Sequence, residues 1–271
     1  MADPFPAVAE SSATGATAKI FGDIRRTVGV RVVNLVWRHL ATIDGALPWT
    51  WKAVKPLYAQ GMVDCAAIRF RKTMSLPTLA SLVGDEPSTV DAVLASYDHS
   101  NTINLFALGA LVAWLRGETA RQGAPETGPR LPAPNLTLPR LALQEDTPAE
   151  VWALVLRLNR FGDPEPVILA SMYRHLAHAP GFLHKLEIAL APAEADGTLG
   201  RSIALNKKQA CERAKVLARA IAAERPASVS AIEAGLSAFA DTAIGKMVTI
   251  CRAIRVARGN ASGHNGAAPS P

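Results

Sequence analysis

Cysteine is scarce in this chain of 271 residues, which has only Cys65, Cys211 and Cys251. Their wide separation provides no Cys-x-x-Cys pair, no ligand spacing of a zinc site and no disulfide framework. We therefore expect buried free thiols in a reducing compartment and no bound metal.

Long apolar segments and a basic leader are missing as well. The longest apolar run, residues 105–114, is too short to cross a bilayer. The N-terminus has acidic residues and prolines where a secretory signal has basic residues followed by an apolar stretch. We expect a soluble, cytoplasmic protein with no membrane partner.

Charged and aromatic residues are few, at 19% and 6%, whereas hydrophobic residues make up 49% of the chain. This composition, dominated by Ala, Leu and Val, predicts an all-α fold of packed helices. The net charge of +6 is spread over the chain without an aromatic stacking set, so nucleic acid is not an expected partner. A small anionic ligand suits the mild positive charge better.

The common catalytic motifs are also lacking. The chain has no glycine-rich phosphate loop, no His-Glu-x-x-His motif and no nucleophile elbow. ATP, NAD and structural zinc are therefore not expected, and the chain should need no cofactor.

An internal repeat is the most informative feature that is present. Residues 37–61 align without a gap on residues 173–197, with ten identities that include Arg38-His39 on Arg174-His175. A repeat of long period that occurs twice indicates a duplicated domain rather than a solenoid. We interpret the chain as a fused pseudo-dimer of two helical repeats, residues 17–116 and 149–258. A proline-rich linker, residues 117–148, joins them, and residues 1–16 and 259–271 are expected to be disordered.

Apolar spacing and helix-stop residues predict the helices of each repeat. The predicted helices include residues 31–41, 47–60, 76–83 and 90–116 in the first repeat and 149–160, 167–177, 182–191, 203–223 and 229–257 in the second. A break is expected at residues 98–101, where Asp-His-Ser-Asn brings together four residues of poor helix propensity.

A few polar residues stand on otherwise apolar helices. The duplicated Arg-His pairs favour a structural or interface role, because a residue that serves one asymmetric reaction need not occur twice. His99, beside Asn101, could act as a base near neutral pH or could cap the expected break.

Several segments together resemble the group I 2-haloacid dehalogenases. The resemblance rests on Ile24-Arg25, residues 32–42 and 45–48, Ser100-Asn101, residues 105–111 and residues 176–180. It implies an all-helical pseudo-dimer of the alkylhydroperoxidase-like fold that hydrolyses the carbon–halogen bond of short 2-halocarboxylic acids without a cofactor. In that family an aspartate deprotonates the attacking water and an asparagine holds it, at a site between the halves.

The family's site residues transfer only in part. The water-holding asparagine falls on Asn101 and a serine beside the base falls on Ser171, with Leu35 and Val32 on the substrate side. The catalytic aspartate falls on Met172, whose thioether cannot accept a proton. The repeat pairs Met172 with Val36, which supports a core role for both.

Three explanations of Met172 stay open. Another group, His99, Asp98 or Asp163, could act as the base. The protein could have kept the pocket and lost the reaction, binding or acting on another small carboxylic acid, which we favour. The alignment could also be shifted by a gap among the prolines before Ile168. A non-enzymatic helical assembly protein is the remaining alternative, and a homodimer stays open.

Overall fold

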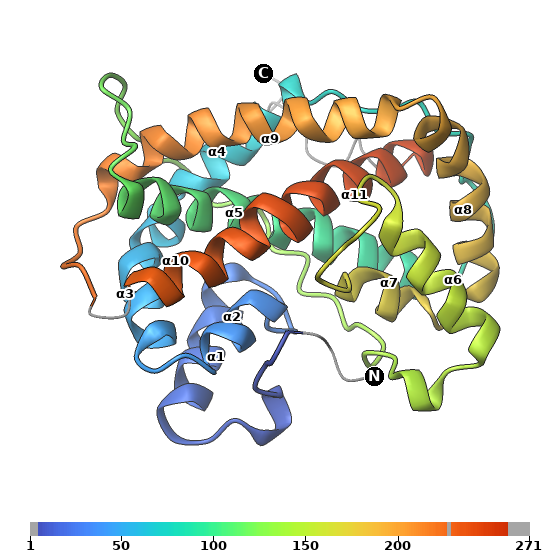
Figure 1. The fold of residues 1–271 in the computed structure, drawn as a ribbon, viewed down its shortest axis with the longest axis horizontal. Helices are drawn as coiled ribbons and strands as arrows, with labels where there is room; N and C mark the ends of the chain where they lie inside the picture. Colours follow the sequence, from blue (N-terminus) through green and yellow to red (C-terminus); the bar gives the residue numbers. More distant parts are fainter. Residues whose placement is uncertain (1–4, 227–228, 260–271) are drawn as a thin grey trace, which may run out of the picture.

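The computed structural model describes residues 5–226 and 229–259, which form helices and loops and no strand (Figure 1). The predicted all-α class is confirmed for this part of the chain. The α-helices are α1 (Gly15–Val28), α2 (Leu35–Leu40), α3 (Ala46–Ala59), α4 (Met62–Thr73), α5 (Ser88–Arg116), α6 (Ala149–Arg160), α7 (Ser171–Leu176), α8 (Pro180–Ala195), α9 (Thr198–Leu217), α10 (Val229–Ser237) and α11 (Gly245–Ala257). Short 3₁₀ turns are Glu10–Ser12, Gln144–Asp146 and Ala218–Ala220, and a π-helix, Ala238–Ile244, joins α10 to α11.

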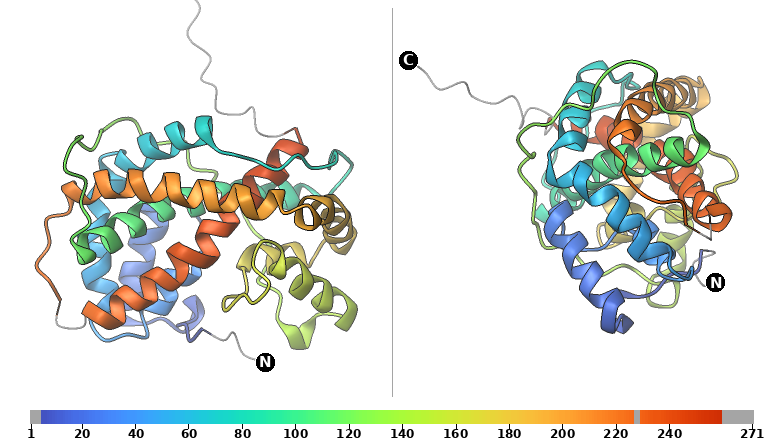
Figure 2. Two further views of the ribbon diagram at one scale, coloured as in Figure 1. Left: turned by 45° about the horizontal axis from the view of Figure 1, so that its top comes forward. Right: turned by 90° about the vertical axis from the view of Figure 1, so that its left-hand side faces the viewer.

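The helices pack around two hydrophobic cores. The first core joins α1 to α4, α10 and the C-terminal half of α5, and the second joins α6 to α8, α11 and the N-terminal half of α5. Helices α1 to α3 therefore lie at one end of the molecule and α6 to α8 at the other, while α5, α9 and the α10–α11 pair run between them (Figures 1 and 2). The middle of α5 lies where the two cores meet.

Helix α5 is continuous over 29 residues, so the expected break at residues 98–101 is wrong. The four polar side chains are buried and three have partners on other elements: Asp98 on Arg255, His99 on the Val28 carbonyl and Ser100 on Asn34. Poor helix propensity costs only about 0.5 kcal/mol per residue, and these tertiary contacts outweigh it.

Other helix boundaries also differ from the prediction. Residues 76–83 are not helical, because the side chain of Asn206 bonds both backbone groups of Ser75, and the Leu82 backbone bonds Ala257 and Arg258.

Helix α4 was not predicted, although Val63, Ala67 and Phe70 mark its buried face. Helices α2 and α7 are shorter than predicted, at six residues each. The predicted helix 203–223 ends in a 3₁₀ turn, and the predicted helix 229–257 contains the π-helix.

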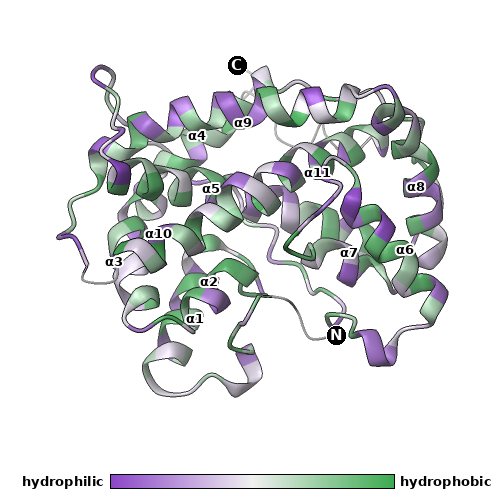
Figure 3. Ribbon diagram, viewed as in Figure 1, coloured by the Kyte–Doolittle hydropathy of each residue, from purple (hydrophilic) through white to green (hydrophobic). Residues whose placement is uncertain are grey.

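Helix α9 shows how the long surface helices are made. Its buried residues recur every three or four positions, and hydrophilic and hydrophobic turns alternate along its ribbon (Figure 3). This spacing gives one apolar face on the cores and one polar face toward water. In the described ranges no helix is both long and apolar enough to cross a bilayer.

The N-terminal segment 5–16, expected to be disordered, is held against the first core. The Phe5 ring packs edge-on against His39, Val8 donates a backbone hydrogen bond to the Arg38 carbonyl, and Glu10 forms an ion pair with Arg25. Residues 1–4 and 260–271 lie outside the described residues. Of the three thiols only Cys251 is fully buried, so the expectation of burial is wrong for the exposed Cys211 and only partly right for Cys65.

The two duplicated histidines make the same contact. His39 Nδ1 lies 2.8 Å from the Pro6 carbonyl oxygen, and His175 Nδ1 lies 2.9 Å from that of Pro139. Each imidazole therefore ties an extended segment to the helix that carries it, a contact that agrees with the structural role expected for the pair.

Lys246 is buried at the start of α11 and gives the fold a pH-dependent stability. Its ammonium donates to the Asn159 carbonyl oxygen at 2.6 Å, and burial lowers the pKa of Lys246 to about 8. Since an unfolded lysine titrates near 10.4, the unfolded chain holds more protons between these values, and stability should rise with pH across that window.

Chemical denaturation from pH 7.5 to 10.5 tests this expectation. Below pH 8 the full penalty, on the order of 3 kcal/mol, is present, and Lys246→Met should flatten the rise by that amount. The exposed Lys208→Met is the control and should keep the native profile. An identical slope in the native chain and Lys246→Met would contradict the assignment.

Candidate functional site

A small apolar cavity lies where the two cores meet. About 50 Å³ of it can hold the centre of a water molecule. The wall is built by the first turns of α2 and α7, the middle of α5, the loop before α7 and the π-helix. The lining residues are Asn34, Leu35, Val36, Tyr97, Asn101, Ile168, Leu169, Ala170, Ser171, Met172, Phe239, Ala243, Ile244 and Met247.

The structure brings four of the proposed site residues to this cavity: Asn101, Ser171, Met172 and Leu35. Asn101 comes from the middle of α5 and is only 6% exposed. Among the described residues its amide has no side-chain hydrogen-bond partner, so it can serve a molecule in the cavity as donor and acceptor. The roles of these residues remain predictions.

Two pairs of residues 136 positions apart line the apolar cavity. Leu35 and Val36 open α2, and Ser171 and Met172, each 136 positions later, open α7. Both pairs line the same cavity. One copy is entirely apolar, and the other adds only the Ser171 hydroxyl.

Tyr97 is the main site residue that the sequence did not indicate. It lies one helical turn before Asn101 on α5 and lines the cavity together with Ser171. Burial raises the pKa of Tyr97 well above its usual range, so the hydroxyl stays protonated. The four-residue spacing from Asn101 on one helix face was the signal that could have found it.

The three proposed bases do not line the apolar cavity. His99 points away from it: its Nε2 lies 2.9 Å from the Val28 carbonyl oxygen, and burial lowers the pKa of His99. Positions 99 and 101 lie on different faces of a helix, which explains why only Asn101 reaches the cavity. Asp163 lies in the turn after α6, where its carboxylate accepts the Glu165 backbone N–H.

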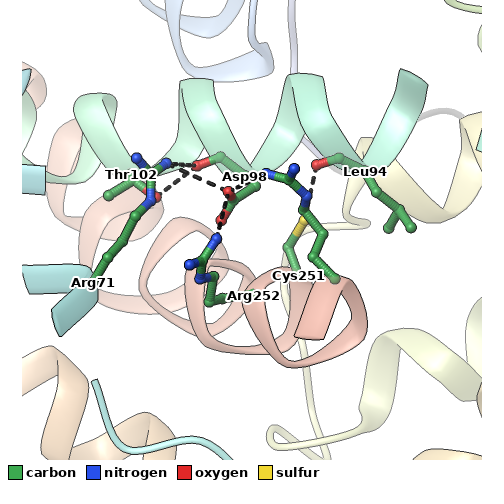
Figure 4. Close-up of polar contacts among 7 residues, drawn as sticks. Arg71, Leu94, Asp98, Thr102, Cys251 and Arg252 are labelled. Carbon is green, nitrogen blue, oxygen red and sulfur yellow. Dashed lines mark hydrogen bonds and ion pairs between the residues drawn. The ribbon is translucent and has the colours of Figure 1, made fainter. Parts of the chain in front are cut away.

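Asp98 is committed to a cluster of arginines contributed by α4 and α11. The carboxylate is 2% exposed, and its Oδ2 lies 2.6 Å from Arg255 and 3.5 Å from both Arg71 and Arg252. Figure 4 shows the arginines of α4 and α11 converging on this carboxylate, with the Cys251 thiol bonded to the Leu94 carbonyl beside it. Asp98 therefore ties α5 to α4 and α11.

A larger polar cavity of about 390 Å³ adjoins the apolar one and shares Asn34, Leu35, Tyr97 and Ser171 with it. Val32, proposed as a substrate-side residue, lines this second cavity instead. Its other lining residues are Ala9, Glu10, Ser11, Val33, Arg38, Ser96, Ser100, Leu138, Pro139, Arg140, Leu141 and His175. We call the two spaces the apolar cavity and the polar cavity.

Three buried polar atoms around the polar cavity have no hydrogen-bond partner among the described residues. They are Asn34 Oδ1, Arg38 Nε and His175 Nε2. Buried polar groups are usually bonded, and exceptions are often found where a ligand or water binds. The pair of cavities can therefore hold a small molecule that is apolar at one end and polar at the other.

The apolar cavity offers hydrogen bonds but no proton acceptor suited to activating water. Its polar side chains are two amides, a serine and a protonated tyrosine, and no carboxylate or imidazole of the described residues lines it. General-base catalysis needs such a group within hydrogen-bond reach of the water. In the described ranges no cluster of three or more His, Cys, Asp or Glu side chains is arranged to hold a metal ion.

Comparison with solved structures identifies the fold. A D-2-haloacid dehalogenase mutant in complex with D-2-CPA is similar at a TM-score of 0.69 and 14% identity, over 96% of this chain and 97% of that chain. A D-2-haloacid dehalogenase with L-LA is similar at 0.72 and 16%, over 94% and 97%. A further mutant of such an enzyme gives 0.71 and 16%, over 96% and 97%. No family model and no curated protein matches the sequence.

These likenesses place the chain in a structural class: an all-α protein with the fold of the D-2-haloacid dehalogenases. The resemblance noted in the sequence is confirmed for the fold. Identities of 14% to 16% carry the fold alone and not the reaction.

Proposed function

We propose that the apolar and polar cavities bind a small 2-substituted carboxylic acid, and that the chain does not hydrolyse it as a dehalogenase would. The observation that carries this proposal is the lining of the apolar cavity. Met172 stands where the resemblance expects the water-activating aspartate, and no other carboxylate or imidazole of the described residues lines that cavity. The polar groups that would hold a ligand, Asn101 and Ser171, are retained.

The ligands of the structural neighbours support the choice of a small acid. They bind 2-chloropropionate and lactate, which are both short acids with one substituent at the second carbon. Because sequence identity to these neighbours is only 14% to 16%, the proposed class of ligand rests on the fold and on the two cavities.

Hydrolytic displacement of halide from 2-halocarboxylic acids, without a cofactor, is the second candidate function. The shared fold and the place of Asn101 favour it. Each of the three proposed bases, His99, Asp98 and Asp163, would have to leave its present hydrogen bonds. A further acceptor is the neutral imidazole of His175, whose unpartnered Nε2 lies at the polar cavity. A non-enzymatic assembly protein is the third alternative and predicts no ligand at all.

Calorimetric titration and halide detection separate these functions. Both enantiomers of 2-chloropropionate and L-lactate are titrated into the purified chain, and released chloride is measured over hours. We expect saturable binding without chloride release, and binding about five- to tenfold weaker in Asn101→Ala, because one or two hydrogen bonds are lost.

Gln60→Ala, at an exposed amide after α3, is the matched control and should bind like the native chain. Chloride release that Asn101→Ala abolishes would favour the hydrolytic function over our proposal. Absence of binding for all three acids would contradict the proposal and leave the assembly role.

We also propose that the fold arose by duplication, with residues 17–116 and 149–258 as the two units. The equal contacts of His39 and His175 support it. Gly61 and Gly197 support it as well, since each precedes a helix with a φ angle in the left-handed region, at 66° and 74°, that glycine adopts readily.

A further inference from the structure

Arg38 projects from α2 into the wall of the polar cavity and is not used by the fold. Among the described residues its guanidinium has no carboxylate partner, and its buried Nε has no hydrogen bond. An arginine in a partly buried position usually pairs with an anion, because burial of an unpaired charge is costly. This charge is therefore available to a ligand.

The other charged groups of the polar cavity are already paired. The Glu10 carboxylate binds Arg25 and accepts the Val33 backbone N–H, and Arg140 forms an ion pair with Asp146. Burial lowers the pKa of His175 to about 4, so that imidazole is neutral at pH 7. The charge that remains unbalanced at the cavity wall is the positive charge of Arg38.

The arginine that aligns with Arg38 differs from it in its hydrogen-bond partners. Arg174, 136 positions later, is buried, and its Nε donates to the Ala142 carbonyl oxygen of the linker at 2.9 Å. Both arginines line a cavity, but the guanidinium of Arg174 is engaged by the linker, whereas that of Arg38 has no such partner among the described residues.

We propose that Arg38 binds the carboxylate of the acid in the polar cavity, while the substituent of its second carbon passes Tyr97 and Ser171 into the apolar cavity. This inference rests on the proposed function and names the group that selects acids. Tyr97 and Ser171 belong to both cavities and can bond the ligand where the two meet.

The two volumes limit the size of the ligand. The polar cavity, about 390 Å³, lies within the roughly 300–1,000 Å³ range of small-molecule sites. The apolar cavity, about 50 Å³, has room for roughly three or four non-hydrogen atoms, at about 10–15 Å³ for each water-sized group. The expected ligand is a monocarboxylic acid with a short substituent at its second carbon.

Titration of matched acid and amide pairs tests the role of Arg38. L-lactate and 2-chloropropionate are compared with lactamide and 2-chloropropionamide, which keep the shape and lose the charge. The native chain should bind each acid at least about tenfold more tightly than its amide, since hydrogen bonds to charged groups are the stronger ones.

Arg38→Met should weaken acid binding about ten- to a hundredfold and leave amide binding within about threefold. Arg38→Lys should fall between, because lysine keeps the charge without the planar fork. Arg26→Met is the control at an exposed arginine that lines neither cavity and already has a carboxylate partner, Asp23, and it should change binding less than twofold. Thermal unfolding checks that each variant is folded.

The outcomes separate this inference from the proposed function. If the native chain binds the acids and Arg38→Met binds them equally well, the role of Arg38 is overturned and the proposed function stands. If the native chain binds no acid, both fail. Equal affinity for acid and amide in the native chain would also overturn the role of Arg38.

Discussion

Met172→Asp should release chloride from 2-chloropropionate, an activity that we do not expect from the native chain. The substitution places a carboxylate in the apolar cavity that Asn101 lines, at the position where the family resemblance expects the base. A positioned general base contributes typically about 10²- to 10⁴-fold, so the gain should be well above the background of spontaneous hydrolysis.

The pH profile of this gain carries information about the site. Met172 is 1% exposed, and burial of a carboxyl in an apolar cavity raises its pKa above the usual value near 4. Because only the ionised carboxylate can take the proton from water, chloride release should rise with pH through that raised pKa and then level off.

Met172→Asn is the matched control for this experiment. It has nearly the size of aspartate and no group that accepts a proton, so it should stay inactive. Adding Asn101→Ala to Met172→Asp should abolish most of the gain. A folded Met172→Asp chain that binds the acid and releases no chloride would show that position 172 does not face the reacting carbon.

Asp98→Ala should cause the largest loss of stability of any single substitution considered. The carboxylate is the shared partner of Arg71, Arg252 and Arg255. The side chains of these arginines are 13%, 16% and 15% exposed. Removal of this carboxylate takes away an anion that three partly buried cations share. Breaking a buried ion pair typically costs about 3–5 kcal/mol, which corresponds to a fall in melting temperature of about 6–20 °C at this chain length.

Rescue by a small anion makes this prediction specific. Formate fits the space that the carboxylate leaves, so it should raise the melting temperature of Asp98→Ala more than that of the native chain. Glu187→Ala removes the exposed partner of Arg157 and should cost less than about 1 kcal/mol. A loss of under 1 kcal/mol in Asp98→Ala would mean that the arginines do not depend on the carboxylate.

The sequence predicted the helical class from composition and brought Asn101, Ser171, Met172 and Leu35 to one site through the repeat and the resemblance. It could do so because the spacing of apolar residues is set within each helix, and because residues 37–61 align on residues 173–197 without a gap. The continuity of α5 could not be predicted in this way. It depends on partners for Asp98 and His99 that are distant in the chain.

The polar cavity could not be predicted from the sequence either, because it also depends on contacts between residues that are distant in the chain. Arg38 and Arg174 are both followed by His-Leu-Ala, so the sequence does not reveal that Arg174 donates to the linker and Arg38 does not. Tyr97 was missed because no pattern in the sequence links it to Ser171, which lines the same cavity from α7.

The passage of α5 through both hydrophobic cores has a mechanical consequence. The N-terminal half of α5 packs in the second core and its C-terminal half in the first. Helix α10 packs in the first core, and most buried hydrophobic residues of α11 pack in the second. A helix behaves as a stiff rod over this length, so a shift of one core is transmitted to the other end of the molecule. We therefore expect the two cores to loosen together rather than one at a time, and the cavity between them to depend on both.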